Sequence, residues 1–540
     1  MNPVIKPDPY AAGLVAGWNV TDASRLTADL DLETDVAIVG TGAGGGTAAE
    51  ILAKAGLRVL LIEEGPLKTT ADFRMRESEA YPDLYQESAA RKTSDKAINI
   101  LQGRCVGGST TVNWTSSFRT PEPTLAFWRE RYGLDDCTPE ALQPWFETME
   151  RRLGIRPWPV EPNENNASLA RGAGALGIPV AAIRRNVKGC WNLGYCGVGC
   201  PTGAKQSMLI TTIPAALSAG AVMLTRARVE RLMIRGGRAE GVECAAMNPE
   251  GIRPGGRRIT VRARHVVLAA GAVGSPAILL RSGAPDPHGL TGTRTFLHPT
   301  VVAAAIMAQR VAGYSGAPQS MYSDHFLMRD PIDGPLGFKL ETPPLHPVLF
   351  STTLHGFGAF HAELMGEFAQ TQALIALLRD GFHPESRGGR VTLRGDGSPV
   401  LDYPLNDVVW EGARRAYLAM AEIQFAAGAR RVFVVHERCA GYKTPREARD
   451  GIAALHLKPL QARVVSAHVM GGCAMSEDPA RGVVDGRGRH HQLAGLSVFD
   501  GSVFPTSIGA NPQLSIYGLV ARNASRLAEE LTGRPAPVLA

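Results

Sequence analysis

Short apolar runs separated by helical patterns dominate the first part of the chain. Residues 36–39 and 59–62 are uninterrupted apolar runs, too short for helices and typical of strands buried on both faces. Between them, apolar residues over 47–55 recur at helical spacing, and Gly56 ends that pattern. Residues 266–270 form another apolar run, again followed by a helical pattern. Strands that alternate with helices in this way predict a parallel sheet of the α/β class.

The pattern changes between residues 299 and 462. Prolines cluster there, histidines lie among apolar residues, two short strands are expected within 391–402, and a helix is expected over 406–427. After residue 462 the pattern of hydrophobic and polar residues again resembles that of the first part. We therefore expect a peripheral arm and two domains, one of them discontinuous: 1–34 for the arm, 35–298 with 463–540 for the first domain, and 299–462 for the second.

A glycine-rich turn joins the first strand to its helix. Gly40, Gly42 and Gly45 stand in GxGxxG spacing. Such glycines allow a tight turn, a close backbone approach to a pyrophosphate, and close packing of helix on strand, while the helix N-terminus supplies N–H donors. Glu63 ends the next strand, 23 residues after the first of these glycines, where an acid is expected to hold a ribose 2′-hydroxyl. This context predicts a dinucleotide-binding unit rather than a merely structural turn.

Composition excludes several function classes. The 540 residues are 44% hydrophobic and 20% charged with a formal net charge of +6, which is typical of a globular protein and too weakly basic for nucleic-acid binding. No apolar run approaches about 18 residues, so no transmembrane segment is expected, and the N-terminus has no export signal. We expect a cytoplasmic protein, or a periplasmic or membrane-associated one carried by a partner subunit.

Further motifs carry a family resemblance. They are Gly107, Gly108 and Ser109 in a second glycine-rich turn, with Asn113 after it, then residues 271–283 and residues 468–519. In this order, and together with the N-terminal fingerprint, the motifs resemble those of the glucose–methanol–choline (GMC) oxidoreductases, which are FAD enzymes. The resemblance extends over almost the whole chain.

The resemblance implies a fold and a set of cofactor contacts. The family has an α/β (α+β overall) two-lobed architecture like that of p-hydroxybenzoate hydroxylase, with a Rossmann-like FAD-binding domain and a substrate-binding domain of sheet plus helices. By this analogy Val229 presents backbone groups to the adenine, and Asp500 and Gly501 form the turn beneath the pyrophosphate. Some members attach FAD through a histidine just before the asparagine of the second motif. That position is Val112 here, so non-covalent FAD is expected.

The C-terminal block supplies the candidate reacting groups. In related enzymes a histidine at the position of His468 faces the flavin, and a His or Asn occupies the position of Asn511. A neutral imidazole can accept a hydroxyl proton, so His468 is the expected base, with Asn511 hydrogen-bonding the substrate oxygen. Asn511 and Pro512 also predict an N-cap with proline at the first helical position, and the positive end of that helix is expected under the flavin. A core histidine and a cap without a catalytic role are the alternatives.

The cysteines fall into two groups. Five are scattered singly and are expected to be reduced core residues: Cys105, Cys137, Cys244, Cys439 and Cys473. Cys190, Cys196 and Cys200 share one glycine-rich loop, at a spacing that suits an iron–sulfur cluster, and three ligands favour [3Fe–4S]. The loop resembles that of bacterial FAD glucose dehydrogenases, which carry such a cluster. Long-chain alcohol oxidase relatives also have cysteine-rich loops there, so a disulfide, a metal-free loop and a zinc site stay open.

These patterns predict an FAD-dependent alcohol dehydrogenase acting on a small alcohol. The hydroxyl proton would go to His468, the hydride to flavin N5, and the electrons to a non-NAD acceptor such as a cytochrome partner or a quinone. One alternative is an oxidase that passes electrons to O₂ and forms H₂O₂, and another is a flavin electron-relay subunit. The apolar residues within 343–362 are consistent with a hydrophobic alcohol, with a membrane or partner surface, or with core.

Overall fold

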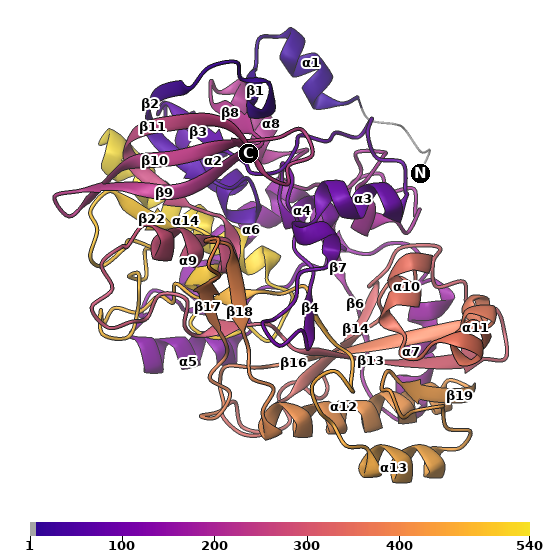
Figure 1. Ribbon diagram of the computed structural model, residues 1–540. Helices are drawn as coiled ribbons and strands as arrows, with labels where there is room; N and C mark the ends of the chain where they lie inside the picture. The colour runs from indigo at the N-terminus through magenta and orange to yellow at the C-terminus, as the bar shows by residue number, and fades with distance from the viewer. Residues whose placement is uncertain (1–6, 540) are drawn as a thin grey trace.

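The computed structural model describes residues 7–539 and contains two large sheets, each with its own helices (Figure 1). The first sheet lies in the upper part of the view together with α14 (Gln513–Thr532), and the second lies below it, above α12 (Asp407–Ala426) and α13 (Pro445–Ala454). This mixed α/β, two-lobed arrangement confirms the fold class expected from the sequence.

The first sheet has the strand order β1-β8-β3-β2-β11-β10-β9, with β22 beside β11. Its strands are β1 (Asn19–Asp22), β2 (Leu30–Val39), β3 (Val59–Ile62), β8 (Val222–Thr225), β9 (Ala227–Arg235), β10 (Arg238–Met247), β11 (Pro254–Leu268) and β22 (Leu496–Val498). The central pairs are parallel, as the apolar runs predict, whereas β9, β10 and β11 are antiparallel.

The N-terminal residues belong to this sheet. β1 pairs with β8, and β2 begins at Leu30, before the apolar run, because its alternating first half pairs with the long β11. The range 1–34, expected as a peripheral arm, thus supplies sheet residues, apart from residues 1–6, which lie outside the described part.

Helices from distant parts of the chain cover the first sheet. α14 packs against α2 and α6, and α2 packs against α8. The α-helices before residue 299 are α1 (Pro9–Val15), α2 (Ala43–Lys54), α3 (Glu77–Leu84), α4 (Ser109–Val112), α5 (Glu122–Tyr132), α6 (Pro139–Leu153), α7 (Glu164–Ala175), α8 (Thr212–Ser218) and α9 (Gly271–Arg281). Of these, α7 packs against α12 and the strands of the second sheet. The first domain is therefore closed by both ends of the sequence.

The second sheet has the strand order β4-β20-β13-β16-β15-β14-β6, with β19 beside β13. Its strands are β4 (Ile98–Ile100), β6 (Ala181–Ala182), β13 (Thr300–Met307), β14 (Met321–Ser323), β15 (Phe338–Glu341), β16 (Thr371–Leu378), β19 (Ala429–Val434) and β20 (Val464–Ser466). Three of these, β4, β6 and β20, come from outside residues 299–462. The second lobe is thus built on the expected segment but is completed by strands from both sides of it.

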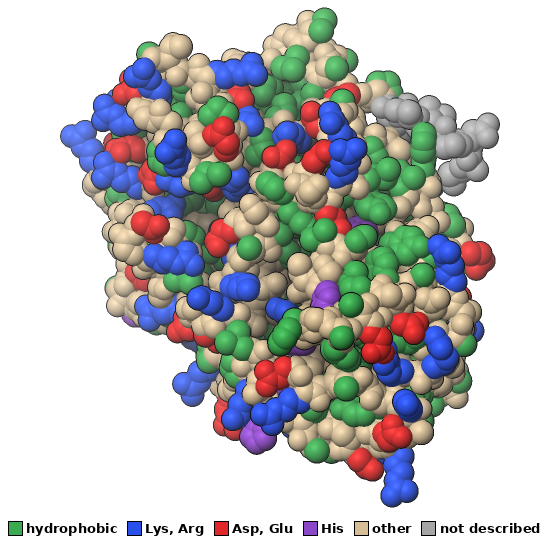
Figure 2. All heavy atoms as spheres, turned by 45° about the vertical axis from the view of Figure 1, so that its right-hand side comes forward, with side chains coloured by type: hydrophobic (Ala, Val, Ile, Leu, Met, Phe, Trp, Pro, Cys, Tyr) green, Lys and Arg blue, Asp and Glu red, His purple; other side chains and the backbone are tan. Residues whose placement is uncertain are grey.

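Smaller elements complete the second domain. They are α10 (Pro347–Thr353), α11 (Gly358–Gly366) and the paired strands β17 (Arg390–Leu393) and β18 (Pro399–Asp402). Two further strand pairs lie elsewhere: β5 (Ile155–Pro157) with β7 (Arg184–Asn186), and β12 (Thr295–Phe296) with β21 (Met470–Gly471). On the face in Figure 2, acidic and basic side chains are interspersed. Within residues 7–539, no helix is both long and apolar enough to cross a bilayer.

Candidate active site

A cavity of about 1590 Å³ lies between the two sheets. Ligand pockets usually enclose about 300–1000 Å³, so this one has room for a large cofactor and a substrate together. It extends from the glycine turn after β2 to α10 and one face of the second sheet. The residues expected to bind the cofactor or to react all line it, except Gly45 and Gly107, and the three loop cysteines do not.

The first glycine turn is fixed by backbone contacts that leave no space for side chains. A Cβ on Gly40, where φ is +98°, would lie 2.4 Å from the carbonyl oxygen of Ala269. A Cβ on Gly45 would lie 1.9 Å from the carbonyl oxygen of Gly40, so helix and strand approach closely there, as expected. Gly44, which the motif does not single out, is tighter still, at 1.6 Å from the carbonyl oxygen of Phe499.

The two glycine-rich turns face each other. A Cβ on Gly108 would lie 2.8 Å from the Cα of Gly42, so bare backbone meets bare backbone. Thr41 joins the turns, because Gly107 N–H donates to its hydroxyl at 3.0 Å and that hydroxyl donates to Glu63 at 2.5 Å. The result is a groove in which backbone N–H groups can approach an anion.

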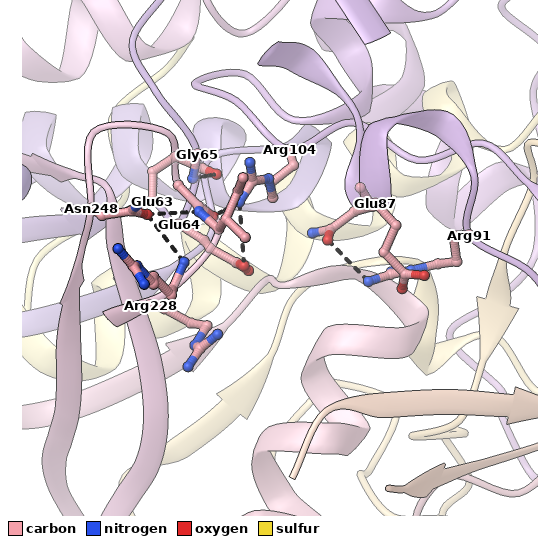
Figure 3. A network of polar contacts seen from close by, with 12 residues as sticks. Glu63, Glu64, Gly65, Glu87, Arg91, Arg104, Arg228 and Asn248 are labelled. Atoms are coloured by element: carbon pink, nitrogen blue, oxygen red, sulfur yellow. Dashed lines mark hydrogen bonds and ion pairs between the residues drawn. The ribbon is translucent and has the colours of Figure 1, made fainter. Parts of the chain in front are cut away.

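Glu63 directly follows β3, and its carboxylate already accepts protein hydrogen bonds. Thr41 N–H and Gly65 N–H donate to it at 3.1 and 2.9 Å, and burial raises its pKa. Next to it, Glu64 lies 3.9 Å from Arg104 (Figure 3). An ionised carboxylate offers about four acceptor sites, so Glu63 retains capacity for a ribose hydroxyl.

Val229 and Asp500 line the cavity but are partly engaged. The guanidinium of Arg281 donates to the carbonyl of Val229 at 3.0 Å, so that oxygen already has a donor. Asp500 accepts from Gly271 N–H at 2.9 Å and from the Ser275 hydroxyl at 2.6 Å. Its carboxylate therefore joins the 271–283 motif to the C-terminal block, a role that the sequence does not reveal.

The remaining expected contacts, Ser109, Asn113 and Gly501, also line the cavity. The Ser109 hydroxyl accepts from Gly103 N–H at 2.9 Å, which holds the second glycine turn closed. The Asn113 amide donates to Gln513 at 2.7 Å, which ties the end of α4 to the start of α14. These polar bonds bring segments distant in sequence to one wall.

His468 follows β20, is partly buried, and lines the cavity between the two sheets. Its Nδ1 is 3.4 Å from Nδ1 of His298, and Gly509 N–H donates to Nε2 of His298 at 3.0 Å. His298 therefore packs against the candidate base without lining the cavity. Burial lowers the pKa of His468 to about 4, and Lys339 lowers it further in the same direction. The imidazole is neutral at pH 7, as a proton acceptor must be.

Glu341 is a residue of this site that sequence reasoning missed. It ends β15 and accepts from Asn511 Nδ2 at 3.2 Å and from Gln319 Nε2 at 2.6 Å. The same Asn511 Nδ2 lies 3.5 Å from His468 Nε2. Burial raises the pKa of Glu341 to about 7. Within residues 7–539, the buried Asn511 Oδ1 has no partner, so it can serve a ligand in the cavity.

A weak signal for Glu341 does exist in the sequence. Lys339 and Glu341 stand two residues apart in a short strand between apolar residues, so their side chains share one face. Both are buried, and the Lys339 ammonium lies 3.4 Å from the ring centre of Phe118 and 4.0 Å from that of Tyr322. Two charges on one face of a buried strand favour a functional site over core.

The family models described as GMC oxidoreductase match residues 81–300 and 384–519. This chain belongs to the GMC oxidoreductase family. It is 31% identical to an uncharacterized GMC-type oxidoreductase of Mycobacterium tuberculosis, over 97% of this chain and 82% of that protein. It is 29% identical to the long-chain-alcohol oxidase FAO4A of Arabidopsis thaliana, over 93% of this chain and 69% of that protein.

Solved structures show the same fold at lower identity. Pyridoxine 4-oxidase from Mesorbium loti has a TM-score of 0.67 at 20% identity, covering 91% of this chain and 99% of its own. A formate oxidase variant of Aspergillus oryzae has a TM-score of 0.65 at 17% identity, covering 93% and 100%. These likenesses confirm the GMC architecture.

The residues of the GMC cavity fit FAD. The facing glycine turns leave the bare backbone groove that a pyrophosphate needs, with the N-terminus of α2 at its edge. Val112, at the position where some relatives carry a linking histidine, lines the cavity with an alkyl side chain that cannot form such a bond. The N-terminal residues of α14 line the same cavity near His468.

The prediction that Asn511 caps α14 is wrong. The helix begins at Gln513, its N-cap residue is Pro512, and no side chain caps it. The Asn511 Nδ2 donates to Glu341 and lies near His468, and in this orientation the Oδ1 that would cap the helix accepts no backbone N–H. Asn511 is thereby part of the polar group around His468 rather than of the helix.

The cysteines divide as expected, but the loop does not form a metal site. The five scattered cysteines are buried and free, which confirms that prediction. Cys190, Cys196 and Cys200 are half-buried and free. Among residues 7–539, no three His, Cys, Asp or Glu side chains are grouped so that they could hold a metal ion. The residues present therefore do not fit the expected [3Fe–4S] cluster or a zinc ion.

Two buried cations lie beside the cysteine loop. Arg185 donates to Cys196 Sγ at 3.6 Å and to Thr115 at 2.7 Å. Lys205 donates to the carbonyls of Thr111 and Cys196, each at 2.7 Å, and burial lowers its pKa to about 8. These bonds join the loop to the segment after the second glycine turn, so its evident role is to brace that wall.

Proposed function

We propose that this GMC protein oxidises an alcohol to an aldehyde or ketone, with non-covalent FAD in the cofactor half of the cavity and the alcohol against residues of 299–462. The observation that carries the proposal is the pair of His468 and Asn511 at the cavity wall, where a neutral imidazole meets an amide that also donates to the buried Glu341. FAD supplies an acceptor for the hydride, and with it two electrons, from the carbinol carbon.

The protein's own side chains bind the hydroxyl group of the alcohol and take its proton. The neutral imidazole of His468 accepts the hydroxyl proton, and Asn511 orients the substrate oxygen through its amide. Glu341 fixes that amide by holding Nδ2. The positive N-terminal end of α14 faces the cavity, where it stabilises negative charge that develops there. Ribose recognition by Glu63 and adenine recognition at the backbone of Val229 belong to the same proposal.

The electron acceptor divides two versions of this function. A dehydrogenase would pass the electrons to a protein or quinone, whereas an oxidase would pass them to O₂. The second version is favoured by relatives such as the long-chain-alcohol oxidase FAO4A.

Anaerobic mixing of the FAD-loaded protein with alcohols tests the proposal. Loss of the oxidised flavin absorbance, with formation of the matching carbonyl compound, is the expected result. Reduced protein is then exposed separately to O₂ and to a quinone, and the faster reoxidation identifies the acceptor class. If no alcohol of any class bleaches the flavin, the electron-relay alternative replaces this function.

A further inference from the structure

One face of the second sheet forms a wall of the cavity rather than packing under helices. Along β13, Val301 and Ala303 lie in the core with α12, whereas Thr300, Val302 and Ala304 line the cavity, Ala304 also packing against the core. Alternation along a strand explains the division, because successive side chains point to opposite faces. The cavity face of this sheet is therefore a surface that the fold itself leaves for a ligand.

The neighbouring strands extend the same apolar surface. Across from β13, Leu377 pairs with Thr300, Ile375 with Val302 and Ala373 with Ala304. Val302, Ile375, Leu377 and Val435 form a hydrophobic cluster separate from the main cores. The opposite wall comes from the segment around α10, which contributes Leu345, Leu349, Phe350 and Leu354.

The candidate reacting groups lie at one end of β13. Thr300 pairs with Val465, close to His468, so that end of β13 lies at the reacting groups. Ala304 lies four residues farther along, or about 13 Å at the usual rise of a strand. Among the described lining residues of 299–462, charged side chains occur only in the turn at 394–396, and the neighbouring Gly397 contacts Arg281 beside Val229, at the cofactor half.

We propose that this chamber binds the extended apolar tail of the alcohol, with its hydroxyl end at His468 and its tail along β13 and β16. The inference rests on the proposed function and names its substrate class. A polyol would leave hydroxyls against Val302, Ile375 and Leu377 without partners. Each buried hydroxyl without a hydrogen-bond partner weakens binding by roughly 5- to 150-fold.

A series of straight-chain primary alcohols from 1-butanol to 1-decanol tests the inference on the FAD-loaded protein. Burial of one methylene is worth about a fourfold change in affinity. The alcohol concentration that half-saturates anaerobic flavin reduction should fall about fourfold with each added carbon until the tail fills the chamber. Glucose, a polyol with more hydroxyls than apolar surface, should reduce the flavin far less well than 1-octanol.

A binding measurement separates this inference from the proposed function. The matching 2-methyl-2-alkanols have no hydrogen on the carbinol carbon and cannot be oxidised, yet they carry the same tails. Calorimetric titration should give dissociation constants with the same fall per methylene, whether or not any alcohol is turned over. Constants that do not change with chain length would overturn the inference, even if primary alcohols reduce the flavin.

A pair of variants locates the tail. Ala304→Leu fills the far end of the chamber and should shorten the longest tail that still gains affinity. Ala303→Val adds bulk on the opposite face of the same strand, in the core, and should leave the chain-length dependence as in the parent. Both variants are first checked for FAD content. Equal effects of the two substitutions on chain-length dependence would contradict the placement along β13.

Discussion

The two halves of the cavity are lined by different parts of the residues: main chain in one half and side chains in the other. The cofactor half is backbone: Gly40, Gly44 and Gly108 stand where any side chain would collide with another part of the main chain. The substrate half is side chains, with an apolar sheet face and the polar group of His468, Asn511 and Glu341 at one end. A backbone site tolerates almost no substitution, whereas a side-chain site can change its ligand one residue at a time.

This difference fits the two tasks. A dinucleotide presents the same pyrophosphate to every enzyme that uses it, so a fixed groove of N–H groups serves it well. Substrates differ, and the residues that meet them are replaceable without disturbing the sheet behind them. Substitutions in the two halves should therefore fail in different ways: by loss of FAD in one, and by loss of rate or selectivity in the other.

The largest effect is expected in the side-chain half. His468→Ala should retain FAD but slow anaerobic flavin reduction by about 10²–10⁴-fold, because a positioned proton acceptor is lost. His468→Asn keeps polarity without a base and should be nearly as slow. Stopped-flow mixing with an oxidisable alcohol measures the rate. A parent-like rate in either variant would assign the proton to another group.

In the backbone half, Gly45→Ala should weaken FAD binding rather than slow flavin reduction in the protein that still holds FAD. Its Cβ would lie 1.9 Å from the carbonyl oxygen of Gly40, so the turn must shift. Overpacking of this kind costs about 1–3 kcal/mol, or about 5- to 150-fold in affinity. Equilibrium dialysis of FAD measures the loss. Gly174→Ala, on an exposed helix position with open space, is the matched control and should bind FAD normally.

A smaller effect is expected at Glu341, where the two halves meet. The parent's rate of flavin reduction should rise as pH increases through about 7, because ionisation of Glu341 strengthens its hold on Asn511 and favours a proton on the nearby imidazole. Glu341→Gln keeps the shape but cannot ionise, so this rise should vanish and the rate at high pH should fall about tenfold. A rise near pH 7 that persists in the variant would show that another group titrates there.

The smallest effect is expected from the cysteine loop. Replacing Cys190, Cys196 and Cys200 together by Ser should leave flavin reduction by alcohol within about twofold of the parent, since the thiols do not line the cavity. Iron analysis of anaerobically purified parent protein should find only traces. Stoichiometric iron in the parent that is lost in the variant would restore the cluster hypothesis and require the loop to rearrange around it.

The cofactor half could be predicted from sequence because its requirements are local. Gly40, Gly42 and Gly45 lie within one turn, and the short apolar runs beside them predict buried strands. Glu341 could not be predicted with them. Its role depends on pairing between β15 and β16 and on Asn511, which is 170 residues away in the sequence.

At Asn511 a local sequence signal gives the wrong prediction. Asparagine followed by proline is a strong local signal for a helix cap, yet tertiary contacts with Glu341 and His468 decide its position. Likewise β4 and β6 lie far upstream of the segment whose sheet they join. Local patterns specify elements, and the partners of those elements come from distant parts of the chain.

The closure of both sheets by late segments has a consequence for biosynthesis. β20 completes the second sheet, β22 joins the first, and α14 packs on α2. On a ribosome, which releases the N-terminus first, the early glycine turns emerge long before the strands and helix that close over them. Non-local pairings of this kind form slowly and leave apolar surface exposed meanwhile. FAD binding can therefore report that β20, β22 and α14 have been synthesised and have packed in place.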